Sequence, residues 1–204
     1  MNEGDLGGSE ERGHEPAWDQ KVLRLNDELQ AHRLPYAFGG AIALNYHREP
    51  RSTLDIDINV FVDPGQGQAV LQALQGLYGL EGQERATADL RETGQARTIW
   101  GSTFVDLFLA NTDFHASMAS RLERQPFGDG EIPVLAIEDL LVCKVLFDRS
   151  KDWVDIEAVA KTRHDQLDGE YVQRWLGAFL EPNAPRVLRV AELIGAAGGG
   201  ARKH

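Results

Sequence analysis

The sequence predicts an α+β (mixed α/β) fold, in which a small mixed sheet flanked by helices is followed by a helical region. Three observations lead to this prediction. Residues 54–62 alternate apolar and polar side chains, as a half-buried strand does. The runs "ARTIW" and "TFVDLFLA" flank Gly101 and Ser102, which predicts a hairpin. From Glu138 onward, apolar side chains recur with helical spacing.

Each predicted element follows from its own pattern of apolar residues and turn residues. The elements are, in chain order, a helix carrying Trp18, Val22, Leu25 and Leu29, a strand near 36–38, a helix over 41–47, the strand 54–62, a helix around 70–77, hairpins turning at 101–102 and 128–130, and helices over 138–147, 152–162, 170–180 and 184–195.

The 204 residues, 42% of them hydrophobic, suffice for one core. Residues 1–15 are polar and Gly-rich and are predicted to be a disordered tail. A mixed α/β core is expected over 16–135, and a helical region packed on it over 136–195. Residues 196–204 are expected to be a flexible tail. We expect a seam rather than a linker between the two halves, because no Pro/Gly/Ser-rich spacer separates them.

The charge of the chain limits its partners. A net charge of −11 argues against broad nonspecific binding of nucleic acid, which needs a basic surface, although a local basic patch is compatible with it. The sequence contains neither a signal-peptide pattern nor an apolar run of about 20 residues. The sequence therefore predicts a cytoplasmic protein without a membrane partner.

Three aspartates stand on the predicted sheet. Asp55 and Asp57 share one face of their strand, about 7 Å apart. Strands usually avoid aspartate, so a positive ligand is expected between them. Asp106, on a later strand, is the candidate third carboxylate. Oxygen ligands favour Mg²⁺ or Mn²⁺, and such a set can hold two ions. The alternative, a solvated strand face, predicts mixed Thr, Ser, Lys and Arg instead.

A glycine pair precedes these aspartates. Gly39 and Gly40 lie between a predicted strand and a predicted helix. Without a Cβ atom, their backbone N–H groups can approach a phosphate closely, and a helix N-terminus adds partial positive charge. Most such pairs are simply turns, so the pair gains its value from the carboxylate strand that follows.

The strand, the Gly-Gly turn, the helix and then "RSTLDID" resemble the nucleotidyltransferase superfamily, the polymerase-beta-like fold. Its pattern is a Gly-Gly or Gly-Ser turn, a DxD or ExD strand and a third carboxylate, which Gly39, Gly40, Asp55, Asp57 and Asp106 fit in order. The segment "AIEDLLVCKVLFDRSKDWVDIEAV" is similar to two bacterial branches, antibiotic nucleotidyltransferases and abortive-infection toxins of toxin–antitoxin pairs. The resemblance covers roughly residues 36–160. Where polymerase-like members carry Ser, this chain has Gly40, which leaves only backbone donors there.

The resemblance implies an enzyme that moves an NMP group from an NTP to a hydroxyl acceptor and releases pyrophosphate. Asp55, Asp57 and Asp106 would be the catalytic and metal-binding residues, with Asp106 as general base or base-positioning group. Gly39 and Gly40 would bind the triphosphate.

Five further residues support this reading. Arg51 and Thr53 precede the aspartate strand and are expected to contact the triphosphate or the acceptor; the alternative is a loop arginine and a strand threonine. Lys144 interrupts the apolar run "LLVCKVLF", where its ammonium needs an anion. That anion is a nucleotide phosphate, or else Asp152 or Asp155, which share a helix face. In the second case the two aspartates orient Lys144.

The acceptor stays open at this point. A small molecule such as an aminoglycoside favours an acidic cleft, whereas an RNA such as tRNA, the acceptor of a toxin with an antitoxin partner, needs a basic face. Residues able to supply that face are Arg48, Arg51, Arg121, Arg124, Lys144, Arg149 and Lys151. A third alternative is a catalytically silent, nucleotide-binding regulatory member of the fold, against which the three intact carboxylates count.

Overall fold

The computed structural model describes residues 15–77, 79–163 and 166–198. The predictions made for residues 1–14 and 199–204 lie outside this part of the chain. The helices are α1 (Trp18–Ala31), α2 (Gly40–Leu44), α3 (Gly67–Ala73), α4 (Gln83–Thr93), α5 (Asp113–Ala119), α6 (Ile137–Phe147), α7 (Ser150–Arg163), α8 (Gly169–Phe179) and α9 (Pro185–Gly198), with a short 3₁₀ turn, η1 (Pro64–Gln66). The strands are β1 (Tyr36–Phe38), β2 (Ile56–Val60), β3 (Leu80–Glu81), β4 (Gln95–Trp100), β5 (Thr103–Leu109), β6 (Glu123–Phe127) and β7 (Gly130–Val134).

The strands form one mixed sheet in the order β3-β4-β5-β2-β1-β7-β6. β2 runs parallel to β5, and β1 runs parallel to β7, while the other neighbours are antiparallel. Both predicted hairpins are present, β4–β5 around residues 101–102 and β6–β7 around residues 128–130. The predicted mixed α/β class is therefore confirmed, with the helices from α6 onward following the sheet.

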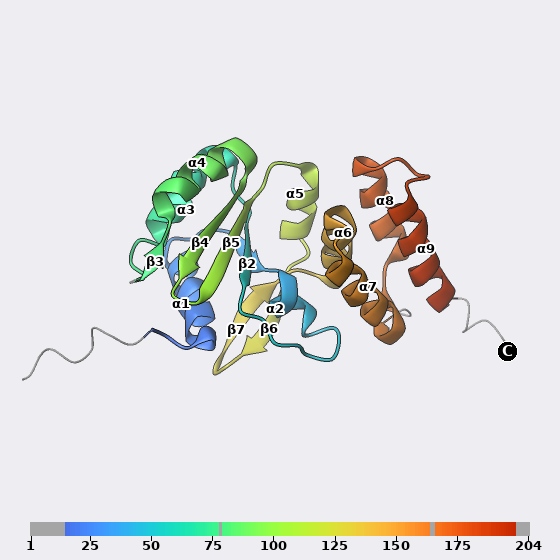
Figure 1. Cartoon of the computed structure of the whole chain (residues 1–204), viewed down its shortest axis with the longest axis horizontal. Helices are drawn as coiled ribbons and strands as arrows, with labels where there is room; N and C mark the ends of the chain where they lie inside the picture. The colour runs from blue at the N-terminus through green and yellow to red at the C-terminus, as the bar shows by residue number, and fades with distance from the viewer. Residues whose placement is uncertain (1–14, 78, 164–165, 199–204) are drawn as a thin grey trace, which may run out of the picture.

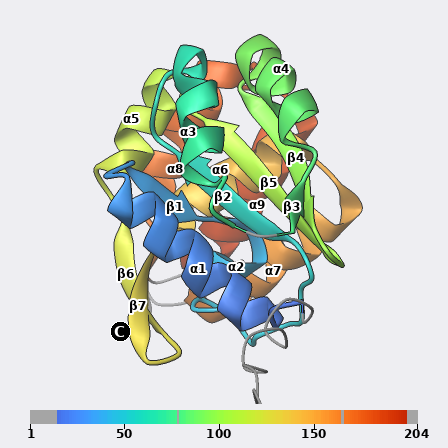
Figure 2. The ribbon, with the colours of Figure 1, turned by 90° about the vertical axis from the view of Figure 1, so that its left-hand side faces the viewer.

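The sheet is covered differently on its two faces (Figures 1 and 2). Viewed from one end of the molecule, α1, α3 and α4 lie in front of the strands, and the helices of the C-terminal half lie behind them. The side chain of Lys21 on α1 is fully buried and donates hydrogen bonds to the Trp100 carbonyl, at 2.6 Å, and to Thr103 Oγ1, at 3.0 Å. These bonds fix α1 at the β4–β5 turn.

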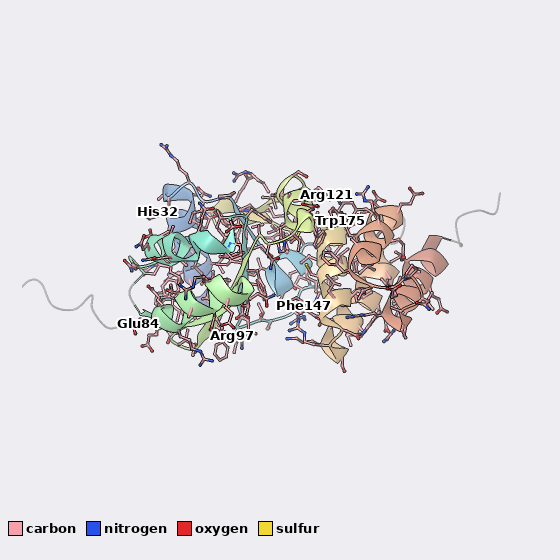
Figure 3. All side chains as sticks on the ribbon, turned by 90° about the horizontal axis from the view of Figure 1, so that it is seen from above. His32, Glu84, Arg97, Arg121, Phe147 and Trp175 are labelled. Atoms are coloured by element: carbon pink, nitrogen blue, oxygen red, sulfur yellow. The ribbon has the colours of Figure 1, made fainter. Side chains whose placement is uncertain are left out.

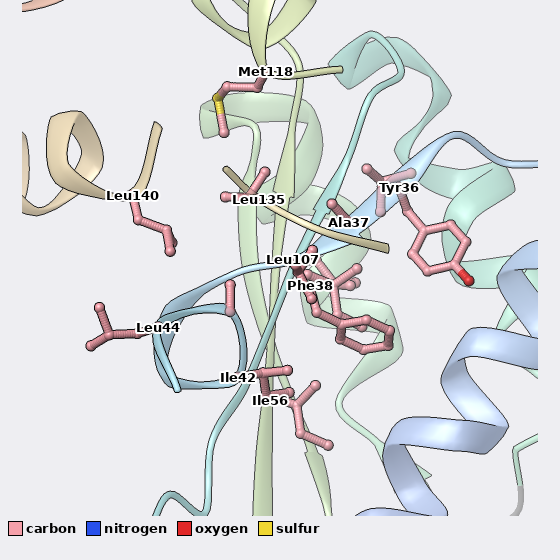
Figure 4. Close-up of a cluster of buried hydrophobic side chains, with 14 of the residues drawn as sticks. Tyr36, Ala37, Phe38, Ile42, Leu44, Ile56, Leu107, Met118, Leu135 and Leu140 are labelled. Atoms are coloured by element: carbon pink, nitrogen blue, oxygen red, sulfur yellow. The ribbon is translucent and has the colours of Figure 1, made fainter. Parts of the chain in front are cut away.

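A cluster of buried hydrophobic side chains lies where the strands, with their alternating apolar and polar residues, pack against the neighbouring helices (Figure 4). Ile56, Ile58 and Val60 of β2 are fully buried, as are Val105 and Leu107 of β5. Apolar burial of this kind contributes roughly 25 cal/mol per Å² removed from water. Because alternate residues point to opposite faces, burying this set turns Asp57 and Asp106 to the other face of the sheet.

The C-terminal helices pack on the sheet-containing half through α5. The Phe114 and Trp175 rings lie 5.1 Å apart, and Ser117 Oγ lies 2.9 Å from Tyr171 Oη. Across the described residues, no helix is long and apolar enough to cross a membrane.

Several predicted bounds are wrong, and two helices were not predicted. The helix predicted over 41–47 ends at Leu44, and α9 continues to Gly198, into the tail predicted from residue 196. The strand predicted over 54–62 is shorter, Ile56–Val60, and Leu54 precedes it with 67% of its surface exposed. α4 and α5 were not predicted, because α4 buries only Ala86 and Leu90, and α5 has only seven residues. Such short apolar patterns do not distinguish a helix from a loop.

Candidate active site

The three candidate aspartates lie together on two adjacent strands. β2 and β5 run parallel in a register that pairs Asp57 with Asp106, and Asp55 immediately precedes β2. Thr53 Oγ1 bonds both the backbone N–H and the backbone carbonyl of Asp55, each at 3.2 Å. We call Asp55, Asp57 and Asp106 the carboxylate wall. The structure thus brings together the residues that the sequence placed on separate strands.

Asp57 is held in an unfavourable state for a carboxylate. Burial, followed by the negative charges of Asp106 and Asp55, raises the pKa of Asp57 to about 6, against the opposing effect of Lys144 and Arg149. Among the described residues, neither Asp55 nor Asp57 has a hydrogen-bond or ion-pair partner for its carboxylate. Two uncompensated carboxylates at one place favour a bound cation.

Gly40 makes room for Asp57. Its φ of +50° lies in the left-handed region, and a Cβ atom placed on it would lie 1.8 Å from Asp57 Oδ2. The backbone N–H of Gly39 donates to the Asp57 carbonyl at 2.9 Å. The predicted use of Gly39 as a phosphate donor is therefore not available, since its N–H already bonds the strand. The glycine pair serves the close approach of turn and carboxylate.

Asp106 differs from its two neighbours, because Arg97 holds it. Arg97 Nε donates to Asp106 Oδ1 at 2.6 Å and Arg97 Nη2 to Asp106 Oδ2 at 2.7 Å. The hydrogen bond with Asp106 is also the main cause that raises the pKa of Arg97. The register of the β4–β5 hairpin pairs the two residues directly across the strands. Arg97 was missed by the sequence analysis.

The opposite side of the site is a network of paired charges on α6, α7 and the loop before β2. Lys144 Nζ donates to Asp155 at 2.7 Å and to Asp152 at 3.2 Å. We call this network the basic cluster; its members are Arg48, Arg51, Lys144, Arg149, Asp152 and Asp155. The predicted pairing of Lys144 with both aspartates is thus present, and Lys144 also lines the pocket described below.

Each aspartate of the basic cluster binds several cations. Asp155 accepts from Arg48 at 2.6 Å and from Arg51 at 3.3 Å, in addition to Lys144. Asp152 accepts from Arg149 Nε at 2.7 Å. Although burial opposes it, the hydrogen bond from Arg149 and the charge of Lys144 lower the pKa of Asp152. Four basic side chains share two carboxylates here, so the cluster keeps an excess of positive charge.

One pocket of about 380 Å³ joins the two sides. It is lined by all three residues of the carboxylate wall and by Gly40, Arg51, Thr53, Arg97, Lys144, Arg149 and Asp152, with an aromatic portion from Phe108, Phe114, Phe147 and Phe179. Figure 3 labels Arg97 on the sheet side and Phe147 at the end of α6. Such a volume is in the range of small-molecule sites, which run from about 300 to 1,000 Å³.

The predicted site residues therefore divide into three groups. Asp55, Asp57 and Asp106 form one wall of the pocket, and Gly40 supports it. Arg51 and Lys144 reach the pocket while bound to the protein's own carboxylates, and Asp152, which accepts from Lys144 and Arg149, lines the pocket with them. For Lys144 the structure shows the alternative, pairing with Asp152 and Asp155, and the contact of Lys144 and Arg51 with a phosphate stays a prediction. Asp155 orients the cluster without lining the pocket, and Arg124 and Arg121 of the proposed basic face do not line it either.

The donor set suits a hard divalent cation, because it consists of carboxylate oxygens. In the described ranges, no three Asp, Glu, His or Cys side chains are arranged as a metal-binding group. Asp55 and Asp57 are the residues that would hold the ion, with Asp106 beside them.

Comparisons with known proteins bear on the family and the fold. A model of the family described as "Nucleotidyl transferase AbiEii toxin, Type IV TA system" matches residues 23–192. No curated protein matches the chain. Two similar solved structures are an antigenic nucleotidyltransferase-like protein from Paracoccidioides brasiliensis (15% identity, 88% of this chain and 92% of that chain, TM-score 0.52) and the antibiotic-resistance factor ANT(2'')-Ia (16% identity, 89% of this chain and 99% of that chain, TM-score 0.51).

At this identity the solved structures show the fold alone, which is that of nucleotidyltransferases. The family match reaches from α1 into α9 and includes every residue of the carboxylate wall and the basic cluster. This chain therefore belongs to the AbiEii family of nucleotidyltransferase toxins of type IV toxin–antitoxin systems.

Proposed function

We propose that the protein transfers an NMP group from an NTP to a hydroxyl acceptor, releases pyrophosphate, and depends on Mg²⁺ or Mn²⁺. The observation that carries this proposal is a pair of carboxylates, Asp55 and Asp57, that have no partner among the residues the structure describes and that line a pocket whose other side carries excess positive charge. A nucleoside triphosphate with its divalent cation complements both sides. When bound, the cation supplies charge neutralisation at the phosphate oxygens.

The protein's own residues then have separate tasks. Lys144, Arg149 and Arg51 border the pocket from the basic cluster and would attract the triphosphate. The acceptor oxygen attacks the α-phosphorus, forming a new O–P bond as the P–O bond to the β-phosphate breaks. The electron pair of the broken bond leaves on pyrophosphate. The hydroxyl proton passes to Asp106, which requires that its contact with Arg97 opens at one oxygen.

The pairing inside the basic cluster suits this task. Because Asp152 and Asp155 fix the four cations, these side chains lose little conformational freedom when an anion arrives. Preorganised charges of this kind stabilise developing charge without reorganisation.

For the acceptor, two classes remain in the proposal. An RNA such as tRNA is favoured by the toxin family and by the excess positive charge of the basic cluster. A small molecule is favoured by the volume of the pocket, about 380 Å³, and by the fold shared with ANT(2'')-Ia, which has been seen with adenylyl-2''-tobramycin. For the RNA reading we propose an antitoxin partner, and for either a location in the cytoplasm, where nucleoside triphosphates are available.

The test supplies each NTP, labelled at its α-phosphate, with Mg²⁺ and a bacterial extract, and then separates RNA, protein and small molecules. Label is expected in one fraction, which names the acceptor class. The Asp55→Ala/Asp57→Ala variant should give none, whereas Asp129→Ala/Glu131→Ala, which removes two exposed carboxylates from the β6–β7 turn, should act like the wild type.

The same assay separates active from silent proteins. Absence of label in every fraction, together with NTP- and Mg²⁺-dependent thermal stabilisation, would favour the regulatory alternative over an enzyme. Label that persists in the Asp55→Ala/Asp57→Ala variant would contradict the assignment of the carboxylate wall.

A further inference from the structure

Arg97 makes a two-pronged contact with the carboxylate wall. Its fork engages both oxygens of Asp106, at 2.6 and 2.7 Å. The guanidinium also lies 4.6 Å from the ring centroid of Phe104, the residue two positions before Asp106 on β5. A planar cation between a carboxylate and an aromatic face occupies a defined position rather than a range of positions.

The two partners of the fork differ in freedom. The side chain of Asp106 is 14% exposed, whereas that of Arg97 is 55% exposed and lies at the rim of the pocket. Asp106 is fixed beside Asp57 by the register of β2 and β5, whereas Arg97 reaches Asp106 from β4 through a long, flexible side chain. When the contact opens, therefore, Arg97 is the partner that moves.

The contact with the Arg97 guanidinium also makes Asp106 a different cation ligand from Asp55 and Asp57. A cation shared by Asp106 and Asp57 has to compete with a guanidinium that already neutralises Asp106. Two cations at one carboxylate repel each other. Asp55 and Asp57 carry no such competitor among the side chains that the structure describes.

We propose that Arg97 is a positioning residue that blocks Asp106 from a divalent cation until the guanidinium moves onto a substrate phosphate. This inference rests on the proposed function, because it takes the carboxylate wall as the cation site. Arg97 then couples the two ligands: a phosphate that draws the guanidinium away opens Asp106, and a cation at Asp106 releases the guanidinium for the phosphate. Such linkage is reciprocal.

A purely structural role of the Arg97–Asp106 contact leads to a different prediction. If Arg97 only orients Asp106 as a ligand for the cation, removing Arg97 should weaken cation binding or leave it unchanged. If Arg97 blocks Asp106, removing it should strengthen cation binding. The sign of the effect separates the two readings.

The experiment measures Mn²⁺ binding to the nucleotide-free full chain by calorimetry and by the loss of the free-ion EPR signal. We expect Arg97→Ala to bind Mn²⁺ about tenfold more tightly than the wild type, within the usual range of coupling between sites. When Arg97 is present and already engages Asp106, the Asp106→Asn substitution should change the Mn²⁺ affinity little. In the Arg97→Ala background the same substitution should remove the gain in affinity. The Mn²⁺ affinity of Arg97→Lys should lie between those of the wild type and Arg97→Ala.

Matched controls keep the outcome interpretable. Arg91→Ala removes the same charge from an exposed position near the end of α4, outside the pocket, and should leave Mn²⁺ affinity unchanged. Circular dichroism and the melting temperature confirm that each variant is folded, which is expected because Arg97 is largely exposed.

Unchanged or weaker Mn²⁺ binding by Arg97→Ala would overturn the inference, as would an equal effect of Asp106→Asn in both backgrounds. If Asp57→Asn abolishes binding while Arg97→Ala has no effect, the proposed function survives and only the blocking role fails. Absence of Mn²⁺ binding in every variant overturns both.

Discussion

The two sides of the pocket hold their charges in opposite ways. In the basic cluster, Lys144, Asp152 and Asp155 are nearly buried, and each is bonded to an oppositely charged partner. In the carboxylate wall, Asp55 and Asp57 have no such partner among the described residues, and Asp106 has one, the half-exposed Arg97. In the pairing of its carboxylates the basic cluster is the complete side of the pocket, although it holds more cations than carboxylates, and the carboxylate wall is the incomplete side.

The difference shows which side needs a ligand. Buried charges are normally paired, because an isolated one costs several kcal/mol, on the order of the whole stability of a domain. The basic cluster satisfies this rule internally and so acts as a scaffold that presents its excess positive charge. The carboxylates of the wall are half-buried, and Asp55 and Asp57 lack such a partner among the described residues, as is common at functional sites. Its charges are balanced only by something that binds.

The largest expected effect concerns the incomplete side. Asp57→Asn keeps the shape of the side chain and removes its charge, so transfer of labelled NMP should fall on the order of a thousandfold. The fold should persist, because the variant loses repulsion rather than a bond. Initial rates at saturating NTP, alongside circular dichroism, measure both. Substantial turnover by folded Asp57→Asn would contradict the claim that the charge of Asp57 is needed to bind a ligand.

The complete side should respond in stability instead. Asp155→Ala leaves Lys144 and Arg48 without their shared carboxylate, and breaking a buried pair of this kind costs about 3–5 kcal/mol. Asp55→Ala, the matched change on the other side, should cost less than about 0.5 kcal/mol. Urea unfolding of both variants measures the difference. Equal losses would show that the two sides are held alike.

The pH dependence of stability should show the strain at Asp57. Its pKa is raised from 3.8 to about 6, so the folded state binds more protons than the unfolded state between these values. Stability of the metal-free protein should therefore fall as pH rises from about 4 to 6, by about 3 kcal/mol from this group. Asp139, whose pKa burial also raises to about 6, contributes a slope of the same sign.

Urea unfolding at a series of pH values, with chelator present, measures this slope. In Asp57→Asn the part of this slope that Asp57 causes should be lost, while the contribution of Asp139 and the opposing contributions of His47 and His115, whose pKa burial lowers, remain. A slope that Asp57→Asn leaves unchanged would show that Asp57 is not strained.

The smallest effect compares the two adjacent glycines. Gly40→Ala places a Cβ atom on Asp57 at a positive φ, which should cost about 1–2 kcal/mol and disturb the carboxylate. Gly39→Ala has a negative φ, and its Cβ atom meets the Asn59 side-chain amide at 2.8 Å, which can shift. Thermal unfolding should rank Gly40→Ala below Gly39→Ala. The reverse order would argue against the close contact of Gly40 with Asp57.

Period-two alternation along residues 56–60 and 103–109 sufficed to predict that Asp57 and Asp106 share a sheet face, because burial of the apolar set fixes the direction of the rest. Arg97 was also within reach: a two-residue turn at Gly101 and Ser102 pairs Trp100 with Thr103 and, counting back, Arg97 with Asp106. Arg97 could thus have been found from the strand register of the predicted hairpin, although it belongs to no sequence motif.

Other features could not be read from the chain. The role of Gly40 depends on its φ and on the distance of its missing Cβ atom from Asp57, neither of which a Gly-Gly pair encodes. Whether Lys144 would bind phosphate or aspartate depended on how α6 packs against α7. Leu54 continued the apolar alternation, yet the strand begins at Ile56 and leaves Leu54 exposed.

The most direct test of the incomplete side needs no acceptor. Thermal unfolding of the wild type and of Asp57→Asn is measured with and without Mg²⁺, at pH 5 and at pH 7.5. Mg²⁺ should stabilise the wild type at pH 7.5 and much less at pH 5, where Asp57 is largely protonated, and should not stabilise Asp57→Asn at either pH. Equal stabilisation of the wild type and Asp57→Asn by Mg²⁺ would contradict the claim that the carboxylate wall is a cation site.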